Sequence, residues 1–365
     1  MGRKCREGKE KAPRKRKIAS ELQELSPLLL FDDAKVASFV IRKALPATIP
    51  GCKLAEMQIK ILGSAAGGAF PQWNCACSNC RAVRAGTFRG KARSQTQVAI
   101  SADGLVWFLL GASPDLRAQI EATIELHPKQ GMRHTPIAGI ALANADVDHV
   151  LGLLLLRELQ PLRIHSTASV RRILREDNSM FGMLHRIPDQ TMWTDFESGK
   201  EFYLRNARGE DSSLRCRAWS LSAHYPAYVT AQRQAQLSAG DSSLGFFIHS
   251  NSGTRLAYMP AVPQVDDALL AEFEACDVLL FDGTFWSDDE LMRVKGGEKI
   301  GQTARQMGHV AVEDTLVRLA GVRRPRKMFL HINNTNPMLD EASPQYRQVR
   351  EAGWEVAEDG WQFNL

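Results

Sequence analysis

Short apolar stretches alternate along the chain with amphipathic ones, and polar residues follow where many of the apolar stretches end. Apolar stretches bounded by turn residues predict strands, and apolar residues at helical spacing predict helices. The predicted strands cover residues 57–63, 95–101, 104–112, 137–143, 161–166, 200–206, 214–225, 244–260 (a hairpin), 277–285 and 327–337. The predicted helices cover residues 114–124, 150–160, 168–176, 266–276 and 312–321, and a last helix and hairpin are predicted over 345–365. This alternation predicts an α/β fold of stacked layers whose loops converge at one edge.

The stretch from Ile137 to Leu156 places a cluster of polar residues between two apolar runs. The first run predicts a buried strand, and the second predicts a helix of about three turns. Between them lie Asn144, Asp146, Asp148 and His149. Carboxylates this close repel each other unless a cation or a proton lies between them. A bound divalent metal ion is the simplest explanation, and capping of the helix by one Asp is the alternative.

Three cysteines, Cys75, Cys77 and Cys80, lie within six residues in the pattern C-x-C-x2-C. Neighbouring cysteines of this kind do not readily form an unstrained disulfide with each other. Tetrahedral zinc takes thiolates at this spacing together with one further ligand. We therefore predict a closed, structural zinc site whose fourth ligand the sequence does not identify, with a redox cluster as the alternative.

Four further polar residues follow apolar strands or precede a helix. Asp282 and His331 each lie where an apolar strand meets a loop, and His224 has a similar place. His309 directly precedes a predicted helix. A run of asparagines follows His331, and such amides can hydrogen-bond to metal ligands. Most single histidines have structural roles. Because of the asparagines that follow it, His331 is the best supported candidate among the histidines His224, His309 and His331.

These residues give a mixed set of ligands for one ion: Asp146, Asp148, His149 and His331. Two imidazoles and a carboxylate with open positions are the ligand set of non-haem iron oxygenases. The same set also suits manganese or zinc, and a set richer in histidine would favour hydrolytic zinc.

The charge of the chain is concentrated at its beginning. Residues 1–17 carry nine Lys and Arg and two Glu, a net charge of +7, whereas the whole chain carries +5. The rest therefore has a slight negative charge and no evident polybasic field for nucleic acid. We predict that residues 1–56 are a basic extension, disordered or accessory, and that residues 57–365 form the main domain. Alternatives for the extension are a start codon placed too early, with Met57 as the true start, and a tether to RNA or anionic lipid.

Seven cysteines without an even framework indicate a reducing compartment, and hence a cytoplasmic protein. No apolar run is long enough to span a bilayer, and no apolar region of a signal peptide follows the basic start.

The cluster around Asp148 resembles the metal motif H-x-H-x-D-H of the metallo-β-lactamase superfamily. The resemblance implies a four-layer αβ/βα sandwich with metal ions at one edge. In this chain Asp148 and His149 match the last two positions, but Asn144 and Asp146 replace the first two histidines. The superfamily's bridging carboxylate is also replaced, by Pro260. Both departures count against a binuclear zinc-dependent hydrolase and favour a single ion. His224 lies near the superfamily's third histidine.

A closer resemblance is to the PqqB family of pyrroloquinoline quinone (PQQ) biosynthesis proteins. The strings GSAAGGAFPQWNCACSNC, NADVDHVLGLLLLRE, FDGTFWSDDE, QMGHV and HINNTNP carry this resemblance, and they are spread over residues 57–365. The family's cysteine cluster is interpreted as a structural zinc site. The resemblance implies an iron- and O2-dependent hydroxylation of the tyrosine ring of a precursor derived from Glu and Tyr. An older interpretation of the family is transport of PQQ or its precursor to the periplasm, and a soluble carrier is a further alternative.

The resemblance implies roles for the remaining candidates. Fe(II) is expected on His149, His331 and one or both Asp residues of the cluster. His309 and Asp282 are expected to move protons or to orient water, and His309 is the better acid–base candidate because its pKa lies near neutrality. Arg93 and His224 are expected to contact the anionic precursor. The implied partners are this precursor, O2 and other PQQ biosynthesis proteins, and a homodimer is left open.

Overall fold

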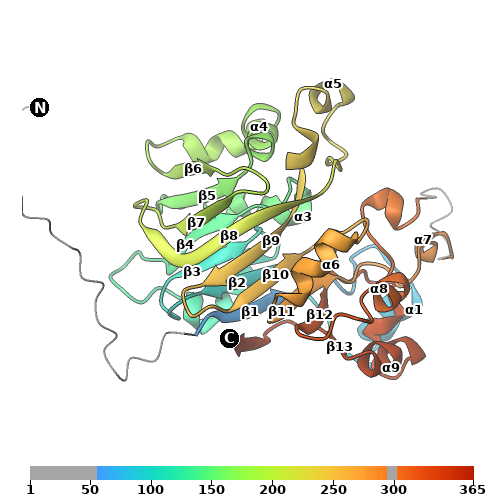
Figure 1. Ribbon diagram of the computed structural model, residues 1–365. Helices are drawn as coiled ribbons and strands as arrows, with labels where there is room; N and C mark the ends of the chain where they lie inside the picture. Colours follow the sequence, from blue (N-terminus) through green and yellow to red (C-terminus); the bar gives the residue numbers. More distant parts are fainter. Residues whose placement is uncertain (1–55, 294–301) are drawn as a thin grey trace, which may run out of the picture. The chain divides into compact units, whose positions relative to one another are not determined.

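The computed structural model describes residues 56–293 and 302–365, whose strands form two seven-stranded sheets (Figure 1). The strand order is β14-β1-β2-β3-β4-β5-β6 in the first sheet and β13-β12-β11-β10-β9-β8-β7 in the second. The first sheet comprises β1 (Gln58–Gly63), β2 (Gln97–Ser101), β3 (Trp107–Leu110), β4 (Ile137–Ala141), β5 (Leu162–Ser166), β6 (Thr191–Asp195) and β14 (Gln362–Asn364). The second comprises β7 (Glu201–Arg205), β8 (Asp211–Ser222), β9 (Ser243–Ser250), β10 (Arg255–Met259), β11 (Val278–Asp282), β12 (Arg326–Leu330) and β13 (Trp354–Val356).

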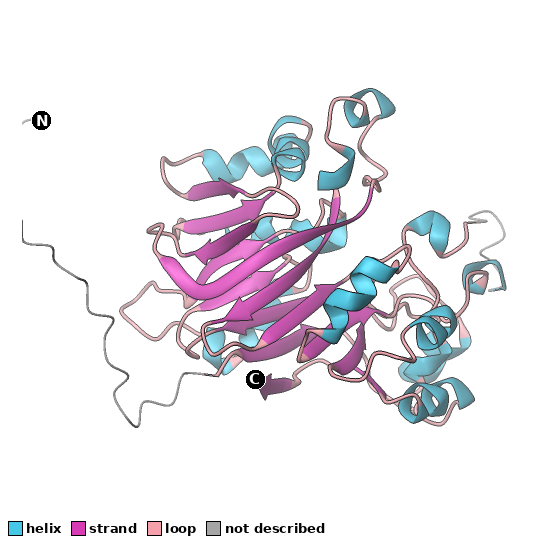
Figure 2. Ribbon diagram, viewed as in Figure 1, coloured by secondary structure: helices cyan, strands magenta, loops and turns pink. Residues whose placement is uncertain are grey.

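The helices lie outside the strands (Figure 2). They are α1 (Ser78–Arg84), α2 (Leu116–Glu121), α3 (Val147–Val150), α4 (Ala168–Glu176), α5 (Ala231–Gln234), α6 (Asp267–Glu274), α7 (Glu290–Arg293), α8 (Val312–Arg318) and α9 (Pro344–Glu351). No helix in these ranges has the length and apolar character that crossing a membrane demands.

Three apolar clusters account for the layering. One lies between the sheets, where Ile59 and Val98 of the first sheet pack with Ile248 and Leu280 of the second. A second cluster joins the outer face of the second sheet to α6, α8 and α9. A third joins the outer face of the first sheet to α2, α3 and α4. Burial of apolar area at each of these boundaries stabilises a helix–sheet–sheet–helix sandwich.

The direction of the strands places the functional loops. Strands β3 to β6 run parallel in the first sheet, and β10 to β13 run parallel in the second. Ligand sites of such sheets lie beyond the carboxyl ends of the parallel strands. The predicted residues of the cluster follow β4, Asp282 ends β11, and His331 follows β12.

The predicted helix over residues 150–160 is wrong. The α-helix α3 has four residues, and a 3₁₀ helix (Leu151–Leu156) follows it. The backbone of Ala112 bonds to two groups that a continued α-helix would pair internally. Its N–H donates to His149 O (2.7 Å), and its carbonyl accepts from Gly152 N (2.9 Å). A Cβ at Gly152 would lie 2.2 Å from the Ser113 carbonyl oxygen, so only glycine permits this approach.

The predicted C-terminal hairpin is also wrong. Strand β13 pairs in parallel with β12 of the second sheet, whereas β14 pairs antiparallel with β1 of the first. The two strands therefore close different sheets. Strand β6 was not predicted, because its half-buried residues at the sheet edge lack a clear apolar pattern. The predicted extension, apart from residue 56, lies outside the described residues.

Candidate metal centre

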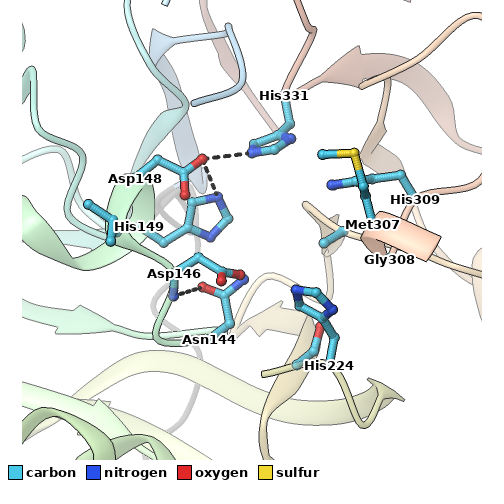
Figure 3. A pocket seen from close by; sticks show the side chains of 12 residues that line it. Asn144, Asp146, Asp148, His149, His224, Met307, Gly308, His309 and His331 are labelled. Carbon is cyan, nitrogen blue, oxygen red and sulfur yellow. Dashed lines mark hydrogen bonds and ion pairs between the residues drawn. The ribbon is translucent and has the colours of Figure 1, made fainter. Parts of the chain in front are cut away.

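A cavity of about 230 Å³ opens where the carboxyl ends of strands from both sheets meet (Figure 3). Polar side chains from several loops point into it, and most of them were predicted from the sequence. The lining residues are Asn144, Asp146, Val147, Asp148, His149, His224, Ser243, Ala261, Met307, Gly308, His309 and His331.

The turn after β4 presents the two carboxylates. The side-chain oxygen of Asn144 accepts a hydrogen bond from Asp146 N (3.1 Å) and so turns the chain into α3. Asp146 occupies the N-cap position, but its side chain makes no capping hydrogen bond. Its carboxylate therefore remains available to the cavity, and helix capping does not account for the cluster. Tyr228 supports the turn from outside by donating to Ala145 O (2.5 Å).

Asp148, His149 and His331 bring their ligand atoms together. His331 Nε2 lies 3.2 Å from Asp148 Oδ2, and His149 Nε2 lies 3.9 Å from the same oxygen. One ligand atom from each residue lies within 4.8 Å of the other two. His149 Nε2 is buried and has no hydrogen-bond partner. A buried nitrogen without a partner is costly, and a metal ion on its lone pair would remove that cost.

The charges in this cluster also suit a cation. Burial opposes ionisation of Asp148, but the neighbouring His149 and His331 hold its pKa well below its usual range. Burial and the charge of Asp148 raise the pKa of Asp146. Burial lowers the pKa of His149, which favours the neutral imidazole that binds metals. One ionised carboxylate and a neutral imidazole therefore face the same space, and a divalent ion would also favour ionisation of Asp146.

A second group, Asp282 with Thr284 and His309, lies on the Nδ1 side of the His331 ring, opposite the Nε2 atom that faces Asp148. Asp282 is fully buried; its Oδ2 accepts from Val262 N (2.9 Å) and lies 2.8 Å from His309 Nδ1. Burial opposes a charge on His309, but Asp282 raises its pKa overall. The carboxylate of Asp282 thus favours the protonated form of His309, whose side chain also lines the cavity.

Thr284 fixes the orientation of His331. Its hydroxyl donates to Asp282 Oδ1 (2.7 Å) and lies 2.9 Å from His331 Nδ1. Because the hydroxyl proton goes to the carboxylate, the hydroxyl accepts from His331 Nδ1–H, which leaves the Nε2 lone pair for a metal ion. His331 itself has a φ of 58°, a left-handed conformation that few residues other than glycine adopt. Such strain is typical of functional sites.

The three cysteines form a separate cluster at the start of α1. The sulfur of Cys77 caps this helix, and the ligand atoms of Cys75, Cys77 and Cys80 lie within 4.8 Å of one another. Burial opposes ionisation of Cys75, but hydrogen bonds from Cys77, Cys80 and Asn334 lower its pKa overall. Burial and the neighbouring sulfurs raise the pKa of Cys77 to about 11. A thiophilic cation would favour ionisation of all three, so the donor set fits zinc.

Two residues predicted to contact substrate have different positions. His224 is exposed and lines the cavity, and a Cβ at Gly308 would lie 3.7 Å from its ring. Arg93 does not line the cavity. It is 4% exposed, and its guanidinium donates to Ser64 Oγ (3.1 Å) and to the Ala357 carbonyl. Arg93 is therefore a structural residue, and we do not retain it as a substrate contact.

The sequence did not single out three residues of the site. Thr284 lies two positions after Asp282, and that spacing is its only signal. Asn334 was considered only as one of several amides near His331, but its side chain contacts the cysteine sulfurs. Met307 lines the cavity from a 3₁₀ helix (Arg305–Met307) that precedes His309, and nothing in the sequence marks it as a site residue.

Comparisons with known proteins identify relatives of the whole described domain. The "Beta-lactamase superfamily domain" family matches residues 106–332. The chain is 41% identical over 313 residues to a coenzyme PQQ synthesis protein B of Pseudomonas putida (strain W619), and 40% identical over 312 residues to that of Methylobacterium sp. (strain 4-46). Each match covers 85% of this chain and 100% of the relative. The chain belongs to the PqqB family.

The structure agrees with this assignment. The zinc-bound crystal structure of PqqB from Methylobacterium extorquens is 37% identical, with a TM-score of 0.75, and the match covers 84% of this chain and all of that one. A diphosphatase of the PhnP family has a TM-score of 0.59 at 16% identity, which shows the shared fold alone. The predicted metallo-β-lactamase fold and the predicted membership of the PqqB family are both confirmed.

Proposed function

We propose that this PqqB-family protein is an enzyme of PQQ biosynthesis that holds one Fe(II) ion on Asp146, Asp148, His149 and His331. The reaction that we propose is the O2-dependent hydroxylation of the tyrosine ring in the precursor derived from Glu and Tyr. The observation that carries the proposal is the convergence of His149 Nε2, buried and without a partner, with Asp148 and His331. The assignment to PQQ biosynthesis is based on the relatives, which are coenzyme PQQ synthesis proteins B.

The ligand set is compatible with iron, and the proposed reaction requires a redox-active metal. Two imidazoles with a carboxylate and open positions are the set used by non-haem iron oxygenases. Bound Fe(II) would supply the redox chemistry that O2 activation requires. A zinc-bound relative shows that a PqqB protein takes up zinc, so the identity of the metal has to be measured in this chain.

The residues around the ion have separate tasks. Thr284 holds the His331 ring by accepting from Nδ1, and Asp282 in turn holds Thr284. His309 lines the cavity, and despite burial Asp282 raises its pKa, so His309 is the chain's candidate for donating a proton to a substrate oxygen. The buried Asp282–His309 pair keeps this proton beside the site.

The cavity also limits how an anionic precursor binds. Among the residues that the structure describes, none that lines the cavity is Lys or Arg, so there the metal ion and the histidines are the groups available to an anion. His309 lies at the buried side, where despite burial Asp282 raises its pKa, and His224 lies at the exposed side, where burial and the neighbouring His309 lower its pKa. His224 would therefore contact the precursor as a neutral hydrogen-bond donor. We therefore assign His224 to binding of the precursor's carboxylates.

The hydrolase alternative requires a second ion and its bridging carboxylate. After β10 the chain continues through Pro260, and Ala261 lines the cavity where such a carboxylate would be needed. Asn144 also takes a histidine position of the hydrolase motif. Both substitutions favour one ion. The carrier alternative has no specific support in the site, since binding alone does not need the buried Asp282–His309 pair.

The test is oxygen uptake with the cross-linked Glu–Tyr precursor. Protein purified without O2 is loaded with Fe(II) or with Zn²⁺ and supplied with O2 and an external reductant. Ring hydroxylation leaves one oxygen atom to be reduced to water, so a source of two electrons is needed. We expect oxygen uptake and a hydroxylated product from the iron form alone. Equal turnover by iron-free zinc protein would refute the oxygenase, and binding without turnover would support a carrier.

A further inference from the structure

The segment from His331 to Asn336 connects the two candidate metal sites. At one end the His331 side chain lies in the cavity, 3.2 Å from Asp148 Oδ2. Three residues later the Asn334 amide lies against the cysteine cluster, 3.1 Å from Cys75 Sγ and 3.3 Å from Cys80 Sγ. Three residues of chain span at most about 11 Å. The two sites are therefore joined by one short piece of backbone.

Backbone hydrogen bonds hold this segment on both sides. Ile332 donates to Ser64 O (3.0 Å) and accepts from Ala66 N (2.9 Å), so it is fixed to the loop after β1. Asn333 N donates to Thr284 O (3.0 Å), which fixes the segment to the loop after β11. Ile332 and Asn333, the two residues between His331 and Asn334, are therefore held by backbone hydrogen bonds, and the link between the two sites is short and ordered.

The cysteine cluster is also tied to this segment through the backbone. The Asn79 side chain, which lies on α1 between Cys77 and Cys80, donates to the carbonyls of Asn334 and Asn336 (3.2 Å each). Asn336 in turn donates through its side chain to Gly283 O (3.0 Å). The helix that carries the cysteines and the loop that carries His331 are thus held together as one unit.

We propose that Asn334 is the fourth ligand of the cysteine site, through its side-chain oxygen, and that metal occupancy of this site positions His331. The amide already contacts all three sulfurs, and a half-turn about its terminal torsion exchanges nitrogen for oxygen. Tetrahedral zinc needs one ligand beyond three thiolates. The proposal that the cysteine site positions His331 rests on the proposed function, because that function requires His331 to bind the active-site ion.

The coupling has a direct physical basis. With the cysteine site loaded, a metal–oxygen bond would hold Asn334 and so fix the backbone that leads to His331. With the site empty, the Asn334 side chain keeps only its contacts to thiols, which are weak acceptors, while its backbone carbonyl still accepts from Asn79. His331 already has a strained backbone, so it depends on its neighbours to stay in place. Removal of a group that orients a metal ligand typically weakens metal affinity about 10–100-fold.

The ligand is tested by cobalt spectroscopy of the cysteine site. Co²⁺ is bound to the wild-type protein, to Asn334→Ala and to Asn334→Asp, and the visible absorption bands and the sulfur-to-oxygen ligand count from X-ray absorption are compared. We expect Asn334→Ala to change both and Asn334→Asp to retain an oxygen ligand. Unchanged bands and an unchanged ligand count in Asn334→Ala would refute the assignment.

The coupling is tested with Mn²⁺, which prefers oxygen and nitrogen ligands to thiolates and so reports on the Asp–His site. Its dissociation constant is measured by electron paramagnetic resonance in zinc-loaded protein, in Cys75→Ser and in Asn334→Ala. Cys276→Ser is the matched control, because Cys276 is a buried cysteine outside the cluster. We expect both cluster variants to bind Mn²⁺ about tenfold more weakly or worse, and the control and Asn334→Asp to bind like wild type.

The outcomes separate the two proposals. Equal Mn²⁺ affinity with a loaded and an empty cysteine site would refute the coupling and leave the proposed function intact. Absence of Mn²⁺ and Fe(II) binding in the wild-type protein would refute the proposed function, whereas the cobalt experiment would still decide whether Asn334 is a ligand. Circular dichroism on each variant identifies any that fail to fold, and weakened Mn²⁺ binding counts for the coupling only in folded variants. Cys75→Ser, which leaves Asn334 in place, then gives a second and independent measurement.

Discussion

His331 Nε2 lies 3.2 Å from Asp148 Oδ2, although the two residues are 183 positions apart and follow strands of different sheets. Asp148 lies on the helix after β4 of the first sheet, and His331 follows β12 of the second. A metal ion on both residues would link the two sheets of the sandwich at one edge. Despite burial, His149 and His331 hold the pKa of Asp148 well below its usual range, so its carboxylate is ionised. That negative charge would attract a cation to the space between the two loops.

Replacing Asp148 with Asn should abolish metal binding at this edge and leave the metal of the cysteine site. The amide keeps the shape of the side chain but loses the charge that attracts the ion. Metal content per chain, measured by mass spectrometry, should fall by one ion. The control is Asp314→Asn, which removes an exposed carboxylate on α8 and should change nothing. Full activity in Asp148→Asn would remove Asp148 from the site.

Thr284→Val should weaken Mn²⁺ binding at the Asp–His site about 10–100-fold, because His331 loses the hydroxyl that fixes its tautomer. The variant should also lose about 1–3 kcal/mol of unfolding free energy, since Asp282 Oδ1 loses a buried donor. Thr284→Ser keeps the hydroxyl and should restore both properties. A Val variant with wild-type affinity would show that His331 does not need Thr284.

Asp282→Asn should move the alkaline limb of the activity profile to lower pH. Burial disfavours the imidazolium of His309, and the carboxylate of Asp282 raises its pKa above the usual value. Without that carboxylate the pKa of His309 falls, so the proton is lost at a lower pH. NMR titration of the His309 ring should show the same direction. Asp267→Asn, at an exposed position of α6, is the control, and an unshifted profile in Asp282→Asn would exclude His309 as the acid.

Trp354→Ala should destabilise the fold by about 3–5 kcal/mol, as expected for loss of a large buried aromatic side chain. Trp354 is 1% exposed and stacks on Phe329 of β12, with ring centroids 4.2 Å apart. Urea unfolding measures the change. Trp73, which is 85% exposed, is the matched control, and Trp73→Ala should stay within about 0.5 kcal/mol of wild type. A small effect at Trp354 would mean that β13 contributes little to the second sheet.

The sequence was informative wherever local pattern decides the structure. The apolar run before Asp146 predicted the strand that forms β4, and residues 168–176 form α4 with the predicted bounds. Carboxyl ends of parallel strands meet at one edge, and for that reason the sequence predicted that Asp148, Asp282 and His331 share that edge. In the structure His331 belongs to two groups of possible ligands, one with Asp148 and His149 and the other with Asp282 and His309.

The failures share a cause in contacts between distant segments. The helix after Asp148 gives way to a 3₁₀ helix because Ala112, far away in sequence, takes its hydrogen-bonding groups. Strands β13 and β14 are close in sequence but join different sheets, and no local pattern distinguishes that from a hairpin. Arg93 was expected to contact the anionic precursor, yet its side chain is buried and donates to Ser64 and Ala357 away from the cavity. The contacts of Asn334 with the cysteine sulfurs are likewise visible only in three dimensions.

The most direct test of one oxygen-activating ion in this cavity is a turnover with isotope-labelled O2, analysed by mass spectrometry of the product. Protein loaded with Fe(II) at the Asp–His site is given the cross-linked precursor and a reductant, in unlabelled water. The product should carry one labelled oxygen atom on the tyrosine ring for each hydroxylation. A product whose new oxygen comes from water, or that forms equally well without O2, would contradict the account.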